Sequence, residues 1–213
     1  MIYNRTMKVK VVIINTEDHL RALAEPERFC SEGRLNKCRA TLNAAVRMQG
    51  YAAELAISYA LSGAALEPPV YSYEKSGKPV IENGYISISH SGKYAVCAVA
   101  DAPVGVDIEV RRTVSPAISR RVLTDAERAE YRAEPSDDYL LRKFVIKEAY
   151  FKMTGEGLGG SFRGVEETEG RLVRKRKDVG YAFEFEPEYA VACIVTEEKL
   201  EAEDVDIIYP SDI

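Results

Sequence analysis

The chain has 213 residues, of which 46% are hydrophobic, so it can bury a substantial core in one large domain or two small fused units. A formal net charge of −5 argues against a general nucleic-acid binder. The sequence contains no apolar run of 18 residues, so we expect no membrane-spanning helix. The four cysteines form no Cys-x-x-Cys pair, and Met1–Lys10 lacks the apolar core of a secretion signal. We therefore expect a reduced, cytoplasmic protein that binds neither nucleic acid nor a membrane.

The first part of the chain predicts a strand followed by helices. The β-branched run Val11–Ile14 indicates a strand, and the helix expected after it would carry His19 as a solvated residue. Arg34 and Lys37, three residues apart, would share one face of a second helix, which by itself indicates only a wet helix surface. Ala44–Leu61 is Ala-rich and predicts a long scaffold helix.

Turns and strands follow. The segment 76–79 (Ser-Gly-Lys-Pro) predicts a turn, and Tyr85–Ser89 alternates as a half-buried strand does before ending in 90–92 (His-Ser-Gly). Two interpretations of that strand end stay open, a phosphate cradle and a polar turn with a hydrogen-bonded histidine. The strands 94–100 and 105–110 are predicted to pair as a hairpin across the turn between them.

On the strand 105–110, alternation places Asp107 and Glu109 together on the face opposite the apolar residues. Two neighbouring carboxylates repel each other, and a hard cation such as Mg²⁺ relieves that repulsion. The alternative is an ordinary amphipathic strand whose polar face lies in water.

The helix around 143–152 carries Glu148 in the middle of an apolar stripe. A carboxylate turned toward a core is usually paired, hydrogen-bonded or bound to a metal, because an isolated buried charge is costly. Alternatively, Glu148 and Lys152 form an (i, i+4) surface pair worth about 0.3–0.5 kcal/mol. Glu127 is explained by helix capping from Thr124. Taken together, Asp107, Glu109 and Glu148 indicate a metal site more strongly than any one of them alone.

Beyond this helix, Gly155–Gly160 predicts a mobile loop, and three further strands follow. The segment Tyr94–Val99 is echoed by Tyr189–Val195, 95 residues later, which suggests a duplicated half-chain. We therefore expect an α+β fold of two similar α/β halves, residues 1–105 and 106–213, with the active site in the cleft between them.

Four motifs carry a resemblance to a known family. Gly105-Val106-Asp107-Ile108-Glu109, followed about 40 residues later by Phe144-x-x-Lys147-Glu148-Ala149-x-x-Lys152, resembles the signature pair of the Sfp-type 4′-phosphopantetheinyl transferases. Upstream, Gly77-Lys78-Pro79 and Ser87-Ile88-Ser89-His90-Ser91 are similar to two further family segments, in the same order. The basic segment 34–39 is similar, less specifically, to the one that the family places near the 3′-phosphate of coenzyme A.

The resemblance implies that the protein transfers the phosphopantetheine arm of coenzyme A to a serine of an apo acyl or peptidyl carrier protein, releasing adenosine 3′,5′-bisphosphate. It implies Glu148 and Lys152 as catalytic residues, with the serine proton going to Glu148 or to a metal-bound water. Mg²⁺ would be held by Asp107, Glu109 and Glu148. The implied coenzyme A residues are Arg34, Lys37 and His90 at the 3′-phosphate with Ser89 nearby, and Ser76, Gly77 and Lys78 at the adenine. We also expect a monomer.

The chain departs from the family pattern at two positions. Phe144 stands where the family usually has Trp, and Gly50 stands where a hydroxyl near the 3′-phosphate is common. Two other functions stay open, a catalytically silent coenzyme A or nucleotide binder and another Mg²⁺-dependent phosphate hydrolase. The sequence does not specify whether the carrier belongs to primary metabolism or to a biosynthetic assembly line.

Overall fold

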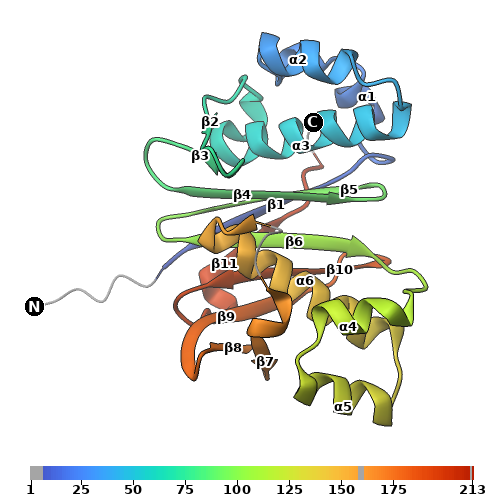
Figure 1. Cartoon of the computed structure of the whole chain (residues 1–213). Coiled ribbons are helices and arrows are strands. Elements are labelled where there is room, and N and C mark those ends of the chain that lie inside the picture. The colour runs from blue at the N-terminus through green and yellow to red at the C-terminus, as the bar shows by residue number, and fades with distance from the viewer. Residues whose placement is uncertain (1–6, 158–160, 212) are drawn as a thin grey trace, which may run out of the picture. The chain divides into compact units, whose positions relative to one another are not determined.

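The computed structural model describes residues 7–157, 161–211 and 213 (Figure 1). The chain divides into two compact units, unit 1 with Met1–Ala102 and Glu201–Ile213, and unit 2 with Pro103–Leu200. This grouping differs from the expected halves 1–105 and 106–213 because the last strand returns to unit 1, where β11 (Val205–Ile208) pairs in parallel with β1 (Val9–Asn15). Part of the predicted mobile loop, residues 158–160, lies outside the described residues.

Unit 1 is a four-stranded sheet in the order β11-β1-β5-β4, with the long helix α3 (Ala44–Ser62) lying along one face (Figure 1). Small alanines on the buried side of α3 let the helix approach the sheet closely. Its other elements are α1 (Leu20–Leu23), α2 (Glu32–Arg39), β2 (Ser72–Tyr73), β3 (Pro79–Val80), β4 (Tyr85–Ser91), β5 (Tyr94–Ala100) and the 3₁₀ turns Pro26–Arg28, Gly63–Ala65 and Ala202–Asp204.

The prediction of a solvated His19 is wrong. The side chain is 7% exposed, and its ring nitrogens lie 2.8 Å from the carbonyl oxygens of Asn15 and Pro210. His19 thereby joins the start of the chain to its C-terminal segment within unit 1. A local sequence pattern could not predict this contact, because Pro210 lies 191 residues after His19 in the sequence.

Unit 2 is an antiparallel five-stranded sheet in the order β6-β10-β9-β8-β7, with the helix α6 (Asp137–Thr154) packed on β6 and β10 (Figure 1). Its other elements are β6 (Val104–Val110), α4 (Ser119–Val122), α5 (Asp125–Ala133), β7 (Glu166–Thr168), β8 (Arg171–Arg174), β9 (Lys177–Phe185), β10 (Ala190–Thr196) and the 3₁₀ turns Pro116–Ile118 and Phe162–Gly164.

The predicted hairpin between 94–100 and 105–110 is wrong, because β5 and β6 belong to different sheets. β5 pairs with β1 and β4, whereas β6 pairs with β10, where Asp107 lies opposite Cys193. Alternation and an intervening turn are local signals, and they do not identify a strand's partner.

The predicted α+β fold with two similar halves is confirmed. In each unit the first strand is followed by a long helix that packs on the sheet, and a later strand returns antiparallel beside the first: β5 beside β1, and β10 beside β6. The two echoed sequence segments are these equivalent strands, β5 and β10.

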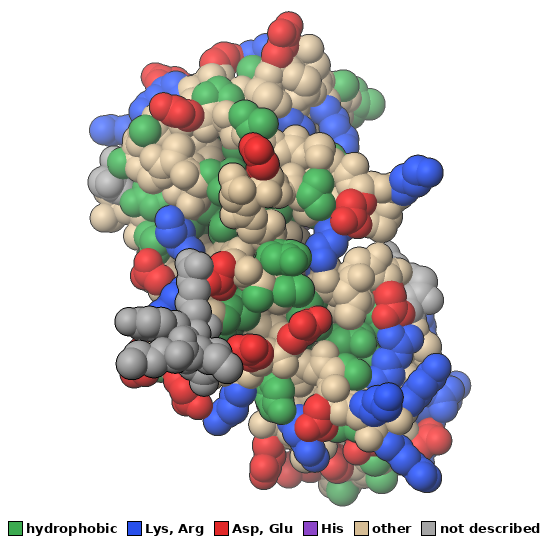
Figure 2. All heavy atoms as spheres, turned by 90° about the vertical axis from the view of Figure 1, so that its left-hand side faces the viewer, with side chains coloured by type: hydrophobic (Ala, Val, Ile, Leu, Met, Phe, Trp, Pro, Cys, Tyr) green, Lys and Arg blue, Asp and Glu red, His purple; other side chains and the backbone are tan. Residues whose placement is uncertain are grey.

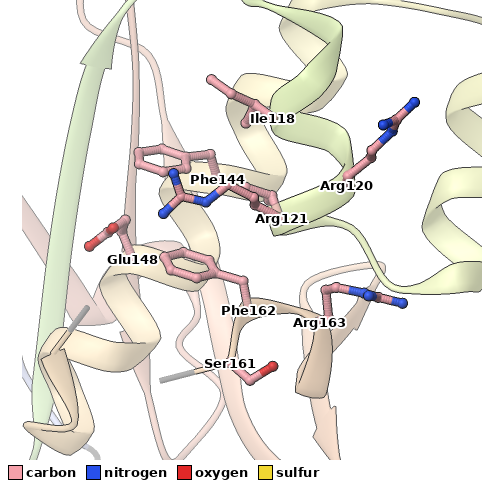
Figure 3. A pocket seen from close by; sticks show the side chains of 9 residues that line it. Ile118, Arg120, Arg121, Phe144, Glu148, Ser161, Phe162 and Arg163 are labelled. Atoms are coloured by element: carbon pink, nitrogen blue, oxygen red, sulfur yellow. The ribbon is translucent and has the colours of Figure 1, made fainter. Parts of the chain in front are cut away.

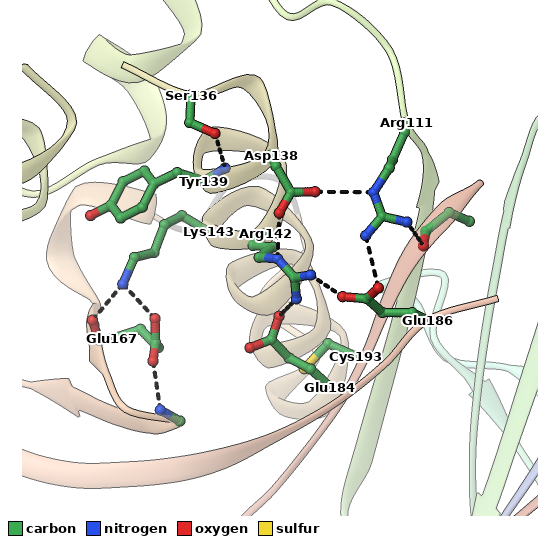
Figure 4. Close-up of polar contacts among 12 residues, drawn as sticks. Arg111, Ser136, Asp138, Tyr139, Arg142, Lys143, Glu167, Glu184, Glu186 and Cys193 are labelled. Carbon is green, nitrogen blue, oxygen red and sulfur yellow. Dashed lines mark hydrogen bonds and ion pairs between the residues drawn. The ribbon is translucent and has the colours of Figure 1, made fainter. Parts of the chain in front are cut away.

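The N-terminal half of α6 is fastened by ion pairs (Figure 4). Ser136 caps the helix by accepting a hydrogen bond from the Tyr139 amide at 3.3 Å. Arg142 binds Asp138 at 2.7 Å within the helix and Glu184 of β9 at 2.7 Å across to the sheet. Single exposed pairs of this kind contribute little, but a network shared by several groups holds the helix against the sheet.

Acidic and basic side chains both occur on the face shown in Figure 2, as the near balance of 34 Asp and Glu against 29 Lys and Arg leads one to expect. Each of the four cysteines is free and buried. Among the described residues, no helix is long and apolar enough to cross a membrane.

Candidate active site

The acidic pair of β6 lies on the face that α6 covers. A Cβ atom added at Gly105 would lie 1.9 Å from the Ala149 carbonyl oxygen of α6, so only glycine permits this approach of helix to strand. Alternation puts Asp107 and Glu109 on the same face as Gly105. Asp107 is 5% exposed, so the alternative of a polar face in water is wrong for this carboxylate.

Both strand carboxylates have a cation of the chain beside them. The Lys152 ammonium donates a hydrogen bond to Asp107 Oδ1 at 2.6 Å, and Arg112 lies 3.6 Å from Glu109. Lys152 is one turn after Glu148 on α6, so the helix presents a base and a cation toward the same strand face. The two elements thus concentrate four charged groups, Asp107, Glu109, Glu148 and Lys152, in one place.

Glu148 is buried at 9% exposure, and the alternative of a surface pair with Lys152 is wrong. Burial raises the pKa of Glu148 to about 7, and the negative charges of Asp107 and Glu109 act in the same direction while Lys152 opposes them. Because these interactions require proximity, the structure brings together the three carboxylates that the sequence singled out.

The chemistry of this donor set fits a hard divalent cation, since Mg²⁺ prefers carboxylate oxygens and its charge would offset both the burial of Glu148 and its repulsion by Asp107 and Glu109. Within the described residues, no group of three His, Cys, Asp or Glu side chains is already arranged around a metal position. The Lys152 ammonium contacts Asp107 directly, at 2.6 Å. The three-carboxylate metal assignment therefore stays a prediction.

A pocket of about 590 Å³ opens beside Glu148 (Figure 3). Phe144 and Phe162 form part of its wall, with their rings stacked 5.9 Å apart. Phe144, the first residue of the motif that ends at Lys152, thus provides aromatic packing in this wall. In Figure 3 the Arg121 side chain extends toward Phe144, whereas Arg120 points away from Glu148. The remaining lining residues are Ile118, Val122, Ser161 and Arg163. Glu148 therefore lines a pocket large enough to admit a small-molecule group.

Behind Glu148, sequence reasoning missed a second set of buried charges. Lys147 is 0% exposed, and its ammonium donates to Glu127 Oε2 at 2.5 Å and to the Val122 carbonyl at 2.9 Å. The same Glu127 forms the predicted capping box with Thr124, so capping explained only part of its role. Lys143 and Glu167 form a further buried pair (Figure 4). The available signal was that Lys147 lies about one helical turn from Phe144, Tyr150 and Phe151, among apolar residues of the helix.

In unit 1, Arg34 of α2 donates from Nε to Glu54 Oε1 at 2.7 Å, and Lys37 lies exposed one turn further on. Arg34 also lines a pocket of about 420 Å³. A Cβ at Gly50, where the sequence departs from the expected hydroxyl residue, would lie 2.9 Å from Cys38 Sγ, so a larger residue there would require the Cys38 side chain to shift.

The predicted adenine segment forms the turn of the β2–β3 hairpin. Gly77 has a φ of +87°, which favours glycine, and its amide donates to the Glu74 carbonyl at 2.9 Å. Ser76 and Gly77 are exposed, and Lys78 is half-buried. On the edge strand β4, Ser89 is buried and His90 is exposed. The turn after them is at Gly92, whose carbonyl accepts from Gln49 Nε2 at 2.9 Å. The expected coenzyme A residues thus all lie in unit 1.

Comparison with known proteins agrees with these motifs. The 4′-phosphopantetheinyl transferase superfamily matches residues 103–204, a span that nearly coincides with unit 2. The 4′-phosphopantetheinyl transferase psf-1 of Bacillus pumilus is 31% identical over 202 residues, covering 88% of this chain and 82% of the relative. Sfp of Bacillus subtilis (strain 168) is 33% identical over 94 residues, covering 41% of this chain and 42% of the relative.

A solved holo-[acyl-carrier-protein] synthase of Thermotoga maritima overlaps in part, with a TM-score of 0.36, 26% identity and coverage of 46% of this chain and 64% of that chain. The similarity to psf-1 covers 88% of this chain, so it includes parts of both units and the motifs of β6 and α6. The chain therefore belongs to the Sfp-type 4′-phosphopantetheinyl transferase family.

Proposed function

We propose that this protein transfers the 4′-phosphopantetheine arm of coenzyme A to a serine of an apo acyl or peptidyl carrier protein in a Mg²⁺-dependent reaction that releases adenosine 3′,5′-bisphosphate. The observation that carries the proposal is that Glu148 of α6 lies close to Asp107 and Glu109 of β6 and lines a pocket. Family membership supports the same reaction, since the relatives are named as transferases of this group.

In this proposal Asp107, Glu109 and Glu148 hold the cation. When bound, Mg²⁺ would neutralise the negative charge that develops as the pyrophosphate linkage of coenzyme A breaks and adenosine 3′,5′-bisphosphate leaves. Lys152, whose ammonium lies beside Asp107, is proposed to contact the transferring phosphate. Glu148 is proposed to take the serine proton, either directly or through a metal-bound water. We propose Glu148 and Lys152 as the catalytic residues.

Unit 1 is proposed to bind the nucleotide end of coenzyme A. Arg34, Lys37 and His90 supply donors for the 3′-phosphate, with Ser89 nearby. The hairpin turn 76–78 offers backbone groups for the adenine, and its exposed Ser76 and Gly77 leave those groups accessible. The four free, buried cysteines support a reducing compartment, and we propose a monomer acting in the cytoplasm.

One experiment separates this function from the alternatives. The protein is incubated with Mg²⁺, coenzyme A and an apo carrier protein, and the products are weighed by mass spectrometry. We expect the carrier to gain the phosphopantetheine arm, with loss of the reaction in EDTA and in Glu148→Gln. Coenzyme A cleaved without a modified carrier would identify a hydrolase, and coenzyme A bound without any product would identify a silent binder. Either result would overturn the proposal.

A further inference from the structure

A fully buried carboxylate stands behind the arginine that is proposed to bind the 3′-phosphate. Glu54 of α3 is 0% exposed, and its Oε1 accepts hydrogen bonds from Arg34 Nε at 2.7 Å and from Tyr71 Oη at 2.6 Å. Its Oε2 is buried without a hydrogen-bond partner among the described residues. Burying a carboxylate is costly unless hydrogen bonds and a charged partner offset the loss of water, and here Arg34 and Tyr71 do so at one oxygen only.

The contact with Arg34 engages only one edge of the guanidinium. Arginine offers five N–H donors, and arginine–carboxylate pairs are frequently bidentate, with two parallel hydrogen bonds. Here Glu54 binds Nε alone, and in the described part of the chain neither terminal Nη group of Arg34 has a hydrogen-bond partner. Arg34 remains 21% exposed and lines the pocket of about 420 Å³ together with Ser31 and Tyr73. The donors best suited to a phosphate are therefore left available.

The same Glu54 carboxylate also connects Arg34 to the β2–β3 hairpin, whose turn 76–78 is proposed to hold the adenine. Tyr71, the second donor to Glu54, packs edge-on against Tyr73 of β2 with ring centroids 5.4 Å apart, and their hydroxyls lie 3.3 Å apart. β2 leads into the turn 76–78. Glu54 thus fixes α2 and the hairpin relative to α3, all within unit 1.

We propose that Glu54 is a positioning residue for coenzyme A recognition, one that holds Arg34 by Nε so that both Nη groups point to the 3′-phosphate. The inference depends on the proposed function, because it needs coenzyme A as the ligand of Arg34. Glu54 touches no reacting atom, so its loss should change the recognition of the 3′-phosphate and leave the chemical step unchanged.

The test compares coenzyme A with dephospho-coenzyme A, which lacks the 3′-phosphate. Both ligands are titrated by calorimetry into the wild-type protein, Glu54→Gln, Arg34→Ala and the double variant, and KM and kcat are measured for both. Glu82→Gln, an exposed glutamate of unit 1, removes the same charge elsewhere and serves as the matched control. Urea unfolding verifies that each variant is folded.

For Glu54→Gln we expect the preference for coenzyme A to fall about tenfold, as for a loss of about 1.4 kcal/mol, with kcat and the affinity for dephospho-coenzyme A unchanged. In the Arg34→Ala background, Glu54→Gln should cause no further loss, because it acts through Arg34. If Glu54→Gln does not fold, Tyr71→Phe carries the comparison, with an expected loss of about threefold, since it removes one of the two donors to Glu54.

Two results would overturn the positioning role alone. The first is a folded Glu54→Gln protein, or a Tyr71→Phe protein where that variant replaces it, whose preference for coenzyme A over dephospho-coenzyme A is unchanged. The second is a variant that loses affinity equally for both ligands. A wild-type protein that transfers the arm yet binds both ligands equally would overturn the positioning role and the assignment of Arg34 while leaving the reaction standing. A wild-type protein that binds neither ligand would overturn the proposed function itself.

Discussion

Replacing Glu148 by glutamine should make the metal-free protein more stable at neutral pH while abolishing transfer. Burial and the neighbouring carboxylates raise the Glu148 pKa from its ordinary value of 4.5 to about 7. The folded protein therefore holds a proton that the unfolded chain releases between these two pH values, so the folded state loses stability as pH rises through this window. The difference of about 2.5 pH units corresponds to about 3 kcal/mol, because one pH unit is worth about 1.4 kcal/mol.

Glutamine keeps the shape of the side chain and removes its charge. The free energy of unfolding is measured with urea in EDTA from pH 4 to pH 8 for both proteins, so that the other titrating groups cancel in the difference. Below pH 4.5 the two proteins should be about equally stable. Between pH 4.5 and pH 7 the free energy of unfolding of the variant should rise relative to that of the wild type. Above pH 7 the difference should reach about 3 kcal/mol.

Two results would refute this reasoning. A stability difference that does not change with pH would mean that burial and the charges of Asp107 and Glu109 do not raise the pKa of Glu148. Normal phosphopantetheine transfer by Glu148→Gln would remove it from the catalytic site, whatever its pKa. If Glu148→Gln is more stable than the wild type and does not transfer the arm, then Glu148 serves the reaction and lowers the stability of the metal-free fold.

Three further substitutions test the architecture around the site. Asp107→Ala should lower kcat/KM for transfer by about 100-fold or more, because it removes a group that acts mainly on the transition state; near-normal turnover at saturating Mg²⁺ would contradict this. Gly105→Ala should destabilise by about 1–3 kcal/mol in urea unfolding and impair transfer, since its Cβ would overlap the backbone of α6. Lys147→Met should cost about 3–5 kcal/mol in the same assay, because it leaves the buried carboxylate of Glu127 without its cation.

Matched controls exist for the last two. Gly33→Ala places a methyl group in the first turn of α2 where nothing lies within 4 Å, so it should change stability by less than about 0.5 kcal/mol. Lys75→Met removes an exposed lysine and should change stability by less than about 0.5 kcal/mol. A Gly105→Ala protein as stable as the parent would mean that β6 and α6 can separate without loss. A Lys147→Met protein as stable as Lys75→Met would mean that the buried pair contributes nothing.

Much of unit 2 could be predicted from the sequence, because its signals are local. Alternation placed Asp107 and Glu109 on one strand face, and helical spacing placed Glu148 among apolar residues of α6. The capping box at Thr124 was confirmed for the same reason, since it involves residues three positions apart. Ordered motifs, which do not depend on contacts at all, indicated the family that the comparison with psf-1 shows.

The tertiary structure alone decided which element covers which face. Periodicity shows that a face is polar but not that α6 lies on it, and it could not show that β5 and β6 enter different sheets. His19 and Arg34, which the sequence indicated as solvated, bind Pro210 and Glu54, and Lys147, for which the sequence indicated no partner, binds Glu127. Such pairs form because a buried polar group must find a partner, and only the folded chain determines which one is within reach.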